Sequence, residues 1–137
     1  MNDREILAAL YATVENRRDN PKEGSYTCYL FREGIDKILK KVGEECTETV
    51  IAAKNLKAAG EDADREALKS DLVGEVADLF YHLQVMLADV GLSIDDVLCE
   101  HEKRNLKVNN KKQFKRFILK KSLRQNLNNT ERYNEQI

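Results

Sequence analysis

The stretch Gly43-Glu44-Glu45-Cys46-Thr47-Glu48 decides how this chain folds, together with Glu75-Val76-Ala77-Asp78 further along. Both stretches lie among apolar residues that recur at helical spacing. Since helical neighbours are three and four residues apart, Glu45 and Glu48 share one face of the first helix, and Glu75 and Asp78 share a face of the second. The polar segment 59–64 allows an antiparallel return. The pattern therefore predicts four carboxylates that converge between two helices.

Converging carboxylates need a physical reason, because like charges repel and unpaired buried charges are costly. A hard divalent cation removes both costs. Mg²⁺ takes oxygen ligands and typically bridges one or two carboxylates to substrate phosphates. The alternative is a solvated acidic helix face, which is the usual origin of a run of charges. Both acid pairs adjoin apolar residues such as Val42 and Leu79, which favours the metal site.

Composition limits the class of protein. The chain has 137 residues, of which 42% are hydrophobic and 34% charged, as expected for a helix-rich protein with one domain, or one domain and a tail. No apolar run reaches the roughly 18 residues of a membrane span, and we expect none. The N-terminal residues lack a signal-peptide pattern. Cys28, Cys46 and Cys99 are widely spaced and form no CxxC motif, which disfavours zinc and favours reduced thiols in the cytoplasm.

Apolar periodicity, capping residues and breakers predict five helices. Ser25 can cap the second helix, Gly34 can end it, and Gly91 can follow the fourth. No alternating strand pattern occurs. We therefore expect an all-α fold, an antiparallel bundle of four to five helices, over residues 2–18, 26–33, 35–56, 65–90 and 94–105.

The C-terminal part differs in charge from the rest. Residues 1–102 hold 12 Lys and Arg against 22 Asp and Glu, a net of −10, whereas residues 103–137 hold 11 against 2, a net of +9. Residues 111–127 combine bases with apolar residues, as in a basic amphipathic helix. We expect one domain over 1–105 and a basic amphipathic extension over 106–137. The extension packs on the acidic body of its own or a partner subunit, or binds a membrane surface or another partner; no motif favours nucleic acid.

Several motifs together resemble one known family. They are Gly24-Ser25-Tyr26-Thr27, Ile38-Leu39-Lys40-Lys41-Val42-Gly43-Glu44-Glu45 with Glu48, Ile51-Ala52-Ala53-Lys54-Asn55, Glu75-x-x-Asp78-Leu79-x-Tyr81-His82-Leu83, and Gly91-Leu92-Ser93 with Val97-Leu98. The series is similar to phosphoribosyl-ATP pyrophosphohydrolases across residues 4–105. That family belongs to the all-α nucleoside triphosphate pyrophosphohydrolases. The acids alone would indicate only this superfamily, and the Ser-Tyr-Thr and Lys-Lys-Val-Gly-Glu-Glu elements point to the member.

The resemblance implies Mg²⁺-dependent hydrolysis of 1-(5-phosphoribosyl)-ATP to 1-(5-phosphoribosyl)-AMP and pyrophosphate, the second step of histidine biosynthesis. It also implies a homodimer or higher homo-oligomer. By position, the metal ligands would be Glu45, Glu48, Glu75 and Asp78. Glu44 and Glu48 would be the catalytic residues, with Glu44 beside the ligands or orienting a water. Phosphoryl transfer needs positioning and electrostatics more than a protein nucleophile, so the lack of a Ser/His/Asp arrangement is no objection.

Substrate phosphates are expected to bind to cationic side chains and to the N-terminal ends of helices. Lys41 and Lys54, with Asn55 adjacent, are candidate contacts, and Ser25, Tyr26 and Thr27 can offer backbone N–H groups at a helix start. The simpler alternatives are solvated lysines and a Ser25 that only caps the helix. His82, one turn after Asp78, either supports a metal ligand or is a hydrogen-bonded core histidine, and the second is favoured.

Two other functions remain open at this point. One is a related pyrophosphohydrolase that acts on other nucleotides, and activity on phosphoribosyl-ATP against common nucleotides would separate the two. The other is a non-catalytic helical interaction module that uses its basic tail. The four acids argue against that module, since binding alone does not need them.

Overall fold

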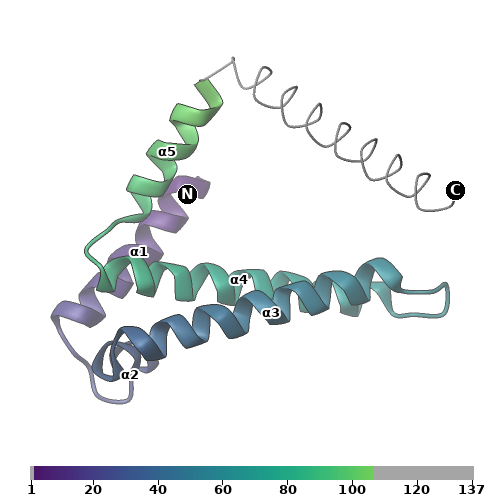
Figure 1. Ribbon diagram of the computed structural model, residues 1–137, viewed down its shortest axis with the longest axis horizontal. Coiled ribbons are helices and arrows are strands. Elements are labelled where there is room, and N and C mark those ends of the chain that lie inside the picture. Colours follow the sequence, from purple (N-terminus) through teal and green to yellow (C-terminus); the bar gives the residue numbers. More distant parts are fainter. Residues whose placement is uncertain (1, 107–137) are drawn as a thin grey trace, which may run out of the picture. The chain divides into compact units, whose positions relative to one another are not determined.

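The computed structural model describes residues 2–106, and this part of the chain contains five α-helices and no strand (Figure 1). The predicted all-α class is confirmed, and each helix begins and ends within two residues of its expected bounds. The predicted extension lies outside the described residues, apart from Leu106, and remains a prediction. The helices are α1 Asp3–Asp19, α2 Tyr26–Glu33, α3 Ile35–Ala58, α4 Arg65–Asp89 and α5 Ile94–Leu106.

At the starts of α1, α2 and α5, side chains satisfy free backbone N–H groups, whereas α3 begins at Gly34 without a side-chain cap. The Asn2 side chain accepts from Glu5 N at 2.9 Å, and the Glu5 carboxylate accepts from Asn2 N at 2.7 Å, which completes a capping box. Ser25 Oγ accepts from Cys28 N at 3.3 Å and caps α2 as predicted. Before α5, the Asp96 carboxylate accepts from Ser93 N at 2.7 Å. This is the contact that a Glu or Gln side chain usually makes in a capping box, and here an Asp makes it.

Two glycines allow the chain to change direction between helices. Gly34 has φ 90° between α2 and α3, and Gly91 has φ 76° just after α4. L-residues with a Cβ rarely adopt positive φ, whereas glycine does so at little cost. These positions therefore end α2 and α4 where the sequence predicted.

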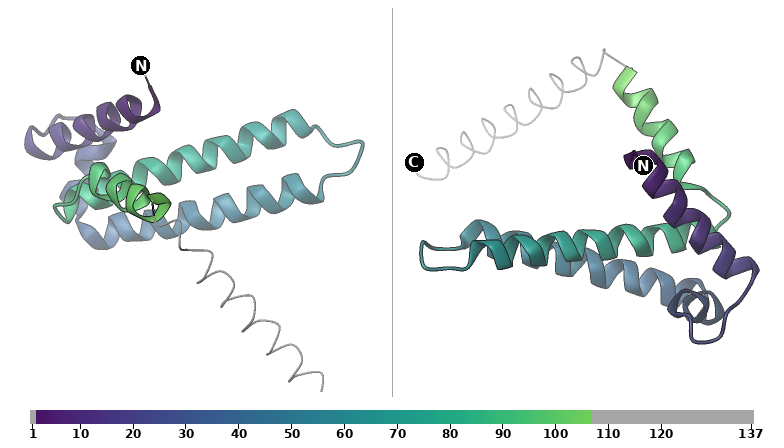
Figure 2. Two further views of the ribbon diagram at one scale, coloured as in Figure 1. Left: turned by 90° about the horizontal axis from the view of Figure 1, so that it is seen from above. Right: turned by 180° about the vertical axis from the view of Figure 1, so that it is seen from behind.

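α3 and α4 form a long antiparallel hairpin, and α1 and α2 lie at the end where α3 begins and α4 ends (Figures 1 and 2). The hydrophobic core lies at this end. Arg18 Nη1 donates to the Ala88 carbonyl at 2.7 Å, which places a cation on the negative C-terminal end of α4. Tyr11 on α1 donates from its hydroxyl to the Leu92 carbonyl. The buried apolar side chains are Tyr11, Val14, Leu30, Ile38, Val85, Leu87 and Ala88.

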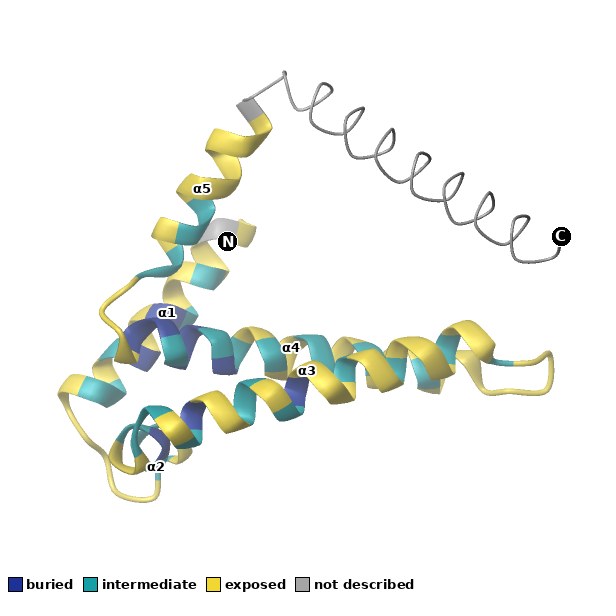
Figure 3. Cartoon of the chain, viewed as in Figure 1, coloured by how far each residue is buried: buried dark blue, intermediate teal, exposed yellow. Residues whose placement is uncertain are grey.

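The other half of the hairpin, toward the loop 59–64, is less covered (Figure 3). Val50 and Ile51 on α3 are 61% and 54% exposed, and Val73 on α4 is 69% exposed. Phe80, nearer the core, is 52% exposed. Burial of apolar surface is the main favourable term in association, so this uncovered surface bears on the assembly of the molecule.

Residues Met1–Val97 form one compact unit. It includes the first turn of α5, where Ile94 and Val97 pack against the core. In the second half of α5, Arg104 Nε lies 2.8 Å from Glu100 Oε1. Within residues 2–106 no helix is both long and apolar enough to cross a membrane.

Candidate functional site

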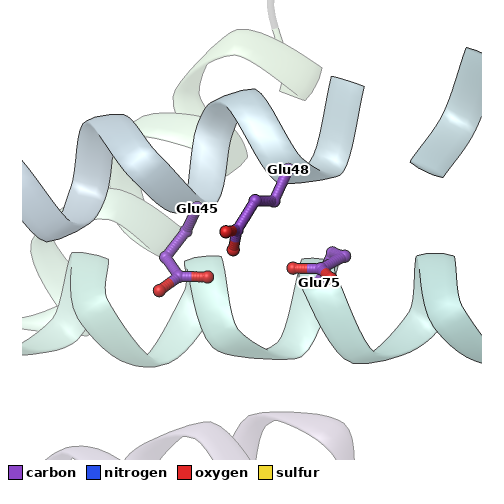
Figure 4. A group of neighbouring side chains, drawn as sticks. All are labelled: Glu45, Glu48 and Glu75. Atoms are coloured by element: carbon purple, nitrogen blue, oxygen red, sulfur yellow. The ribbon is translucent and has the colours of Figure 1, made fainter. Parts of the chain in front are cut away.

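Three of the four predicted metal ligands meet between α3 and α4 (Figure 4). Glu45 and Glu48 project from α3, Glu75 projects from α4, and one carboxylate oxygen of each lies within 4.8 Å of the others. Glu45 is buried, Glu75 half-buried and Glu48 exposed. The group therefore extends from the helix interface to solvent, where a ligand can reach it. We call Glu45, Glu48 and Glu75 the acidic group.

Asp78 does not join this acidic group. Its side chain is exposed, while its backbone carbonyl accepts a hydrogen bond from His82 Nδ1 at 2.8 Å. The spacing Glu75-x-x-Asp78 placed both residues on one helix, but the structure brings only Glu75 to the other two carboxylates. The role of Asp78 as a ligand remains a prediction.

The carboxylates of the acidic group influence one another. The pKa of Glu48 is raised, chiefly because the negative charge of Glu45 disfavours a second charge nearby, with desolvation and Glu75 adding to the effect. Such repulsion is what a divalent cation would relieve. All three donors are hard oxygen ligands of the type that Mg²⁺ binds, so the residues present fit that ion.

Lys41 lies next to the acidic group. Its Nζ is 2.8 Å from Glu44 Oε2 and 3.2 Å from Glu45 Oε1. Hydrogen bonds to both carboxylates raise the pKa of Lys41 well above its usual range, and Lys41 in turn lowers the pKa of Glu44. The sequence singled out Lys41 as a phosphate contact. The structure shows a cation that already balances part of the negative charge.

His82 connects α4 with α2 beside the acidic group. Since the Asp78 carbonyl can only accept, Nδ1 carries the hydrogen, and Nε2 accepts from the Tyr26 hydroxyl at 3.2 Å. Nδ1 also lies 3.7 Å from Glu45 Oε1. His82 is buried, as the favoured interpretation expected. Thr27 Oγ1 and the Tyr81 hydroxyl, 2.5 Å apart, give α2 a second connection to α4.

A hollow of about 250 Å³ lies beside the acidic group, between α3 and α4. We call it the hairpin hollow. Glu48 and Asn55 from α3 line it together with Asp71 and Glu75 from α4. Its apolar lining consists of Ile51, Ala52 and Leu68. Asp71 belongs to none of the motifs that predicted the site, although its position four residues before Glu75 places both on one helix face.

A second hollow, of about 400 Å³, lies at the start of α2. Its lining includes the predicted contacts Ser25 and Tyr26 and two cations, Lys22 and Arg32. Sequence spacing gave no signal for Lys22, because it lies in the loop before α2, whereas Arg32 lies on α2 itself. Of the other predicted contacts, Thr27 and the exposed Lys54 line neither of these two hollows.

Comparison with known proteins now decides the family. A family model described as phosphoribosyl-ATP pyrophosphohydrolase matches residues 7–105. The chain belongs to the phosphoribosyl-ATP pyrophosphohydrolase family. The match includes every residue of the acidic group and both hollows. The resemblance noted from the motifs is therefore confirmed.

Members of this family from several bacteria are similar to the chain. The phosphoribosyl-ATP pyrophosphatase of Clostridium acetobutylicum is 48% identical over 118 residues, which cover 86% of this chain and 97% of that protein. The phosphoribosyl-ATP pyrophosphatase of Streptococcus thermophilus is 52% identical over 92 residues, 67% of this chain and 78% of that protein. A histidine biosynthesis bifunctional protein of Caldanaerobacter subterraneus is 51% identical over 100 residues, 73% of this chain and 43% of that protein. Family membership makes the chain an enzyme of the hydrolase class.

Proposed function

We propose that this chain catalyses Mg²⁺-dependent hydrolysis of 1-(5-phosphoribosyl)-ATP to 1-(5-phosphoribosyl)-AMP and pyrophosphate, in the second step of histidine biosynthesis. The observation that carries the proposal is the convergence of Glu45, Glu48 and Glu75 in a chain of this family. The reaction adds water at a phosphorus atom and breaks the anhydride bond between the α- and β-phosphates. Pyrophosphate leaves, and the proton lost by water passes to a nearby acceptor.

Glu45, Glu48 and Glu75 would hold Mg²⁺, with Asp78 as a further ligand in the proposal. When bound, Mg²⁺ supplies neutralisation of charge on phosphoryl oxygens and lowers the pKa of coordinated water. Glu48 would act as a catalytic residue by holding the ion at the exposed edge of the acidic group. Glu44, held by Lys41 at 2.8 Å, would orient the attacking water.

Phosphates would bind at the cationic end of the site. Lys41 lies beside Glu45, and Lys22 and Arg32 line the hollow at the start of α2 with Ser25 and Tyr26. The N-terminal end of a helix favours anions through its free N–H groups and its dipole. Thr27 and Lys54 would be peripheral contacts, because they line neither hollow.

The proposal includes a homodimer. Exposed residues at helical spacing on α3, Leu39, Cys46 and Val50, and on α4, Val73, Ala77 and Phe80, leave the hairpin with uncovered apolar surface. A second copy that packs against this surface would bury it, and a closed twofold assembly is the commonest arrangement. The free thiols of Cys28, Cys46 and Cys99 suit the reducing cytoplasm, which is the proposed location.

The proposal is tested by measuring pyrophosphate release from phosphoribosyl-ATP by the full chain, with Mg²⁺ and after chelation. We expect turnover only with the metal, and much slower turnover of ATP and other common nucleoside triphosphates. Equal or faster turnover of common nucleotides would assign the chain to another substrate of the superfamily. Turnover that survives complete chelation would contradict the metal-dependent mechanism.

A further inference from the structure

The hairpin hollow has a lining that differs from the rest of the site. One wall continues from the acidic group, since Glu48 and Glu75 belong to both. Beyond them the polar residues are Asn55, seven positions after Glu48, and Asp71, four positions before Glu75. Seven and four residues are close to whole numbers of helical turns, so both pairs project toward the same hollow. The hollow therefore runs from the acidic group toward the loop end of the hairpin.

The charge of this hollow excludes some ligands. The residues that line it include three carboxylates and no cation, so a phosphate would be repelled at the end that Asp71 and Asn55 form. A carboxylate can only accept hydrogen bonds, and an amide can both donate and accept. Among the groups of the proposed substrate, one that suits them offers hydroxyl donors and has carbon atoms to place against Ile51, Ala52 and Leu68. A pentose ring has both properties, and dinucleotide-binding folds also use a carboxylate for ribose hydroxyls.

The position of the hollow selects which part of the substrate meets it. In a nucleoside triphosphate the ribose is joined through its 5′ oxygen to the α-phosphate, so it is the first neutral group next to the bond that breaks. We propose that the hairpin hollow binds the ribose of the adenosine unit, with Asp71 accepting from its hydroxyls and Asn55 completing the contact. This assignment rests on the proposed function, because it takes phosphates at the acidic group as given. Asp71 is then a specificity-determining residue, and its substitution weakens recognition of the sugar.

The test compares substrates with and without the hydroxyls. Phosphoribosyl-ATP and its counterparts with 2′- or 3′-deoxyadenosine are hydrolysed by the full chain and by Asp71→Asn and Asn55→Ala. A hydrogen bond to a charged group contributes enough for about 10- to 100-fold in kcat/KM, so we expect the wild type to prefer the ribose form by that factor. Asp71→Asn should lose most of that preference, mainly through KM on the ribose substrate. Asp89→Asn, an exposed acid at the end of α4 outside the hollow, is the matched control and should keep the preference.

The outcomes separate this proposal from the one on which it rests. Absence of pyrophosphate release by the wild type would overturn the proposed function itself. An active wild type with an undiminished ribose preference in Asp71→Asn would overturn the ribose assignment. A fall in activity of Asp71→Asn that is equal for all three substrates, with a higher Mg²⁺ concentration at half-maximal rate, would also overturn it, because it would make Asp71 a metal ligand.

Discussion

Glu48 and Glu75 meet Glu45 at one point between two helices, so loss of either carboxylate removes a third of the acidic group. We expect Glu48→Gln and Glu75→Gln to lower turnover of phosphoribosyl-ATP by more than the 10- to 100-fold that is typical when a partner of a metal ligand is lost. Each variant should still fold, because removing one like charge relieves repulsion. The rate of pyrophosphate release measures turnover, and circular dichroism checks that each variant is folded. Glu61→Gln in the exposed loop is the control, and full activity in either site variant would refute the assignment.

The raised pKa of Glu48 also predicts how stability depends on pH in the metal-free protein. A carboxyl whose folded pKa exceeds its unfolded value favours the folded state when protonated, and stability is lost as the pH rises through that range. Glu48→Gln cannot ionise, so at pH 7 it should melt at or above the wild-type temperature. The difference should shrink as the pH falls below about 4, the ordinary range of glutamate. A difference that grows on acidification would contradict this account of Glu48.

At the scale of elements, the short helix α2 is attached to α4 by the hydrogen bond from Tyr26 to His82. Tyr26→Phe leaves Nε2 of a histidine that is only 5% exposed without a partner. We expect the free energy of unfolding to fall by about 1–2 kcal/mol, measured by chemical denaturation. Tyr29→Phe is the control, since no described residue forms a hydrogen bond with the Tyr29 hydroxyl. Equal effects of the two substitutions would show that the Tyr26–His82 bond does not hold α2.

At the scale of the whole molecule, uncovered apolar surface on the hairpin predicts association of two copies. One chain has a mass of 15.8 kDa, and light scattering at micromolar concentration should give twice that mass. Phe80→Asp places a charge on that surface and should shift the protein toward the monomer, because charges are costly to bury in an interface. Ile6→Asp on α1, also at an exposed apolar position, should leave the mass unchanged. A monomeric wild type would contradict the dimer.

Local sequence was sufficient for the helices and their ends. Helical spacing, the caps at Ser25 and Ser93 and the positive-φ glycines Gly34 and Gly91 act over a few residues, so they can be recognised without knowledge of the fold. The meeting of Glu45, Glu48 and Glu75 could also be predicted from local sequence. These residues lie on two long helices joined by a short polar turn, and such a turn makes the helices antiparallel neighbours.

Other features depended on contacts between residues far apart in the chain. The sequence alone could not show that Asp78 stays out of the acidic group, that Lys41 pairs with Glu44 and Glu45, or that Tyr26 bonds to His82. Nor could it show that Asp71 and Asn55 line one hollow with Glu48 and Glu75. The rotation and axial offset of α4 against α3 set these distances. Packing of side chains across the whole interface determines that offset, whereas spacing along one helix does not.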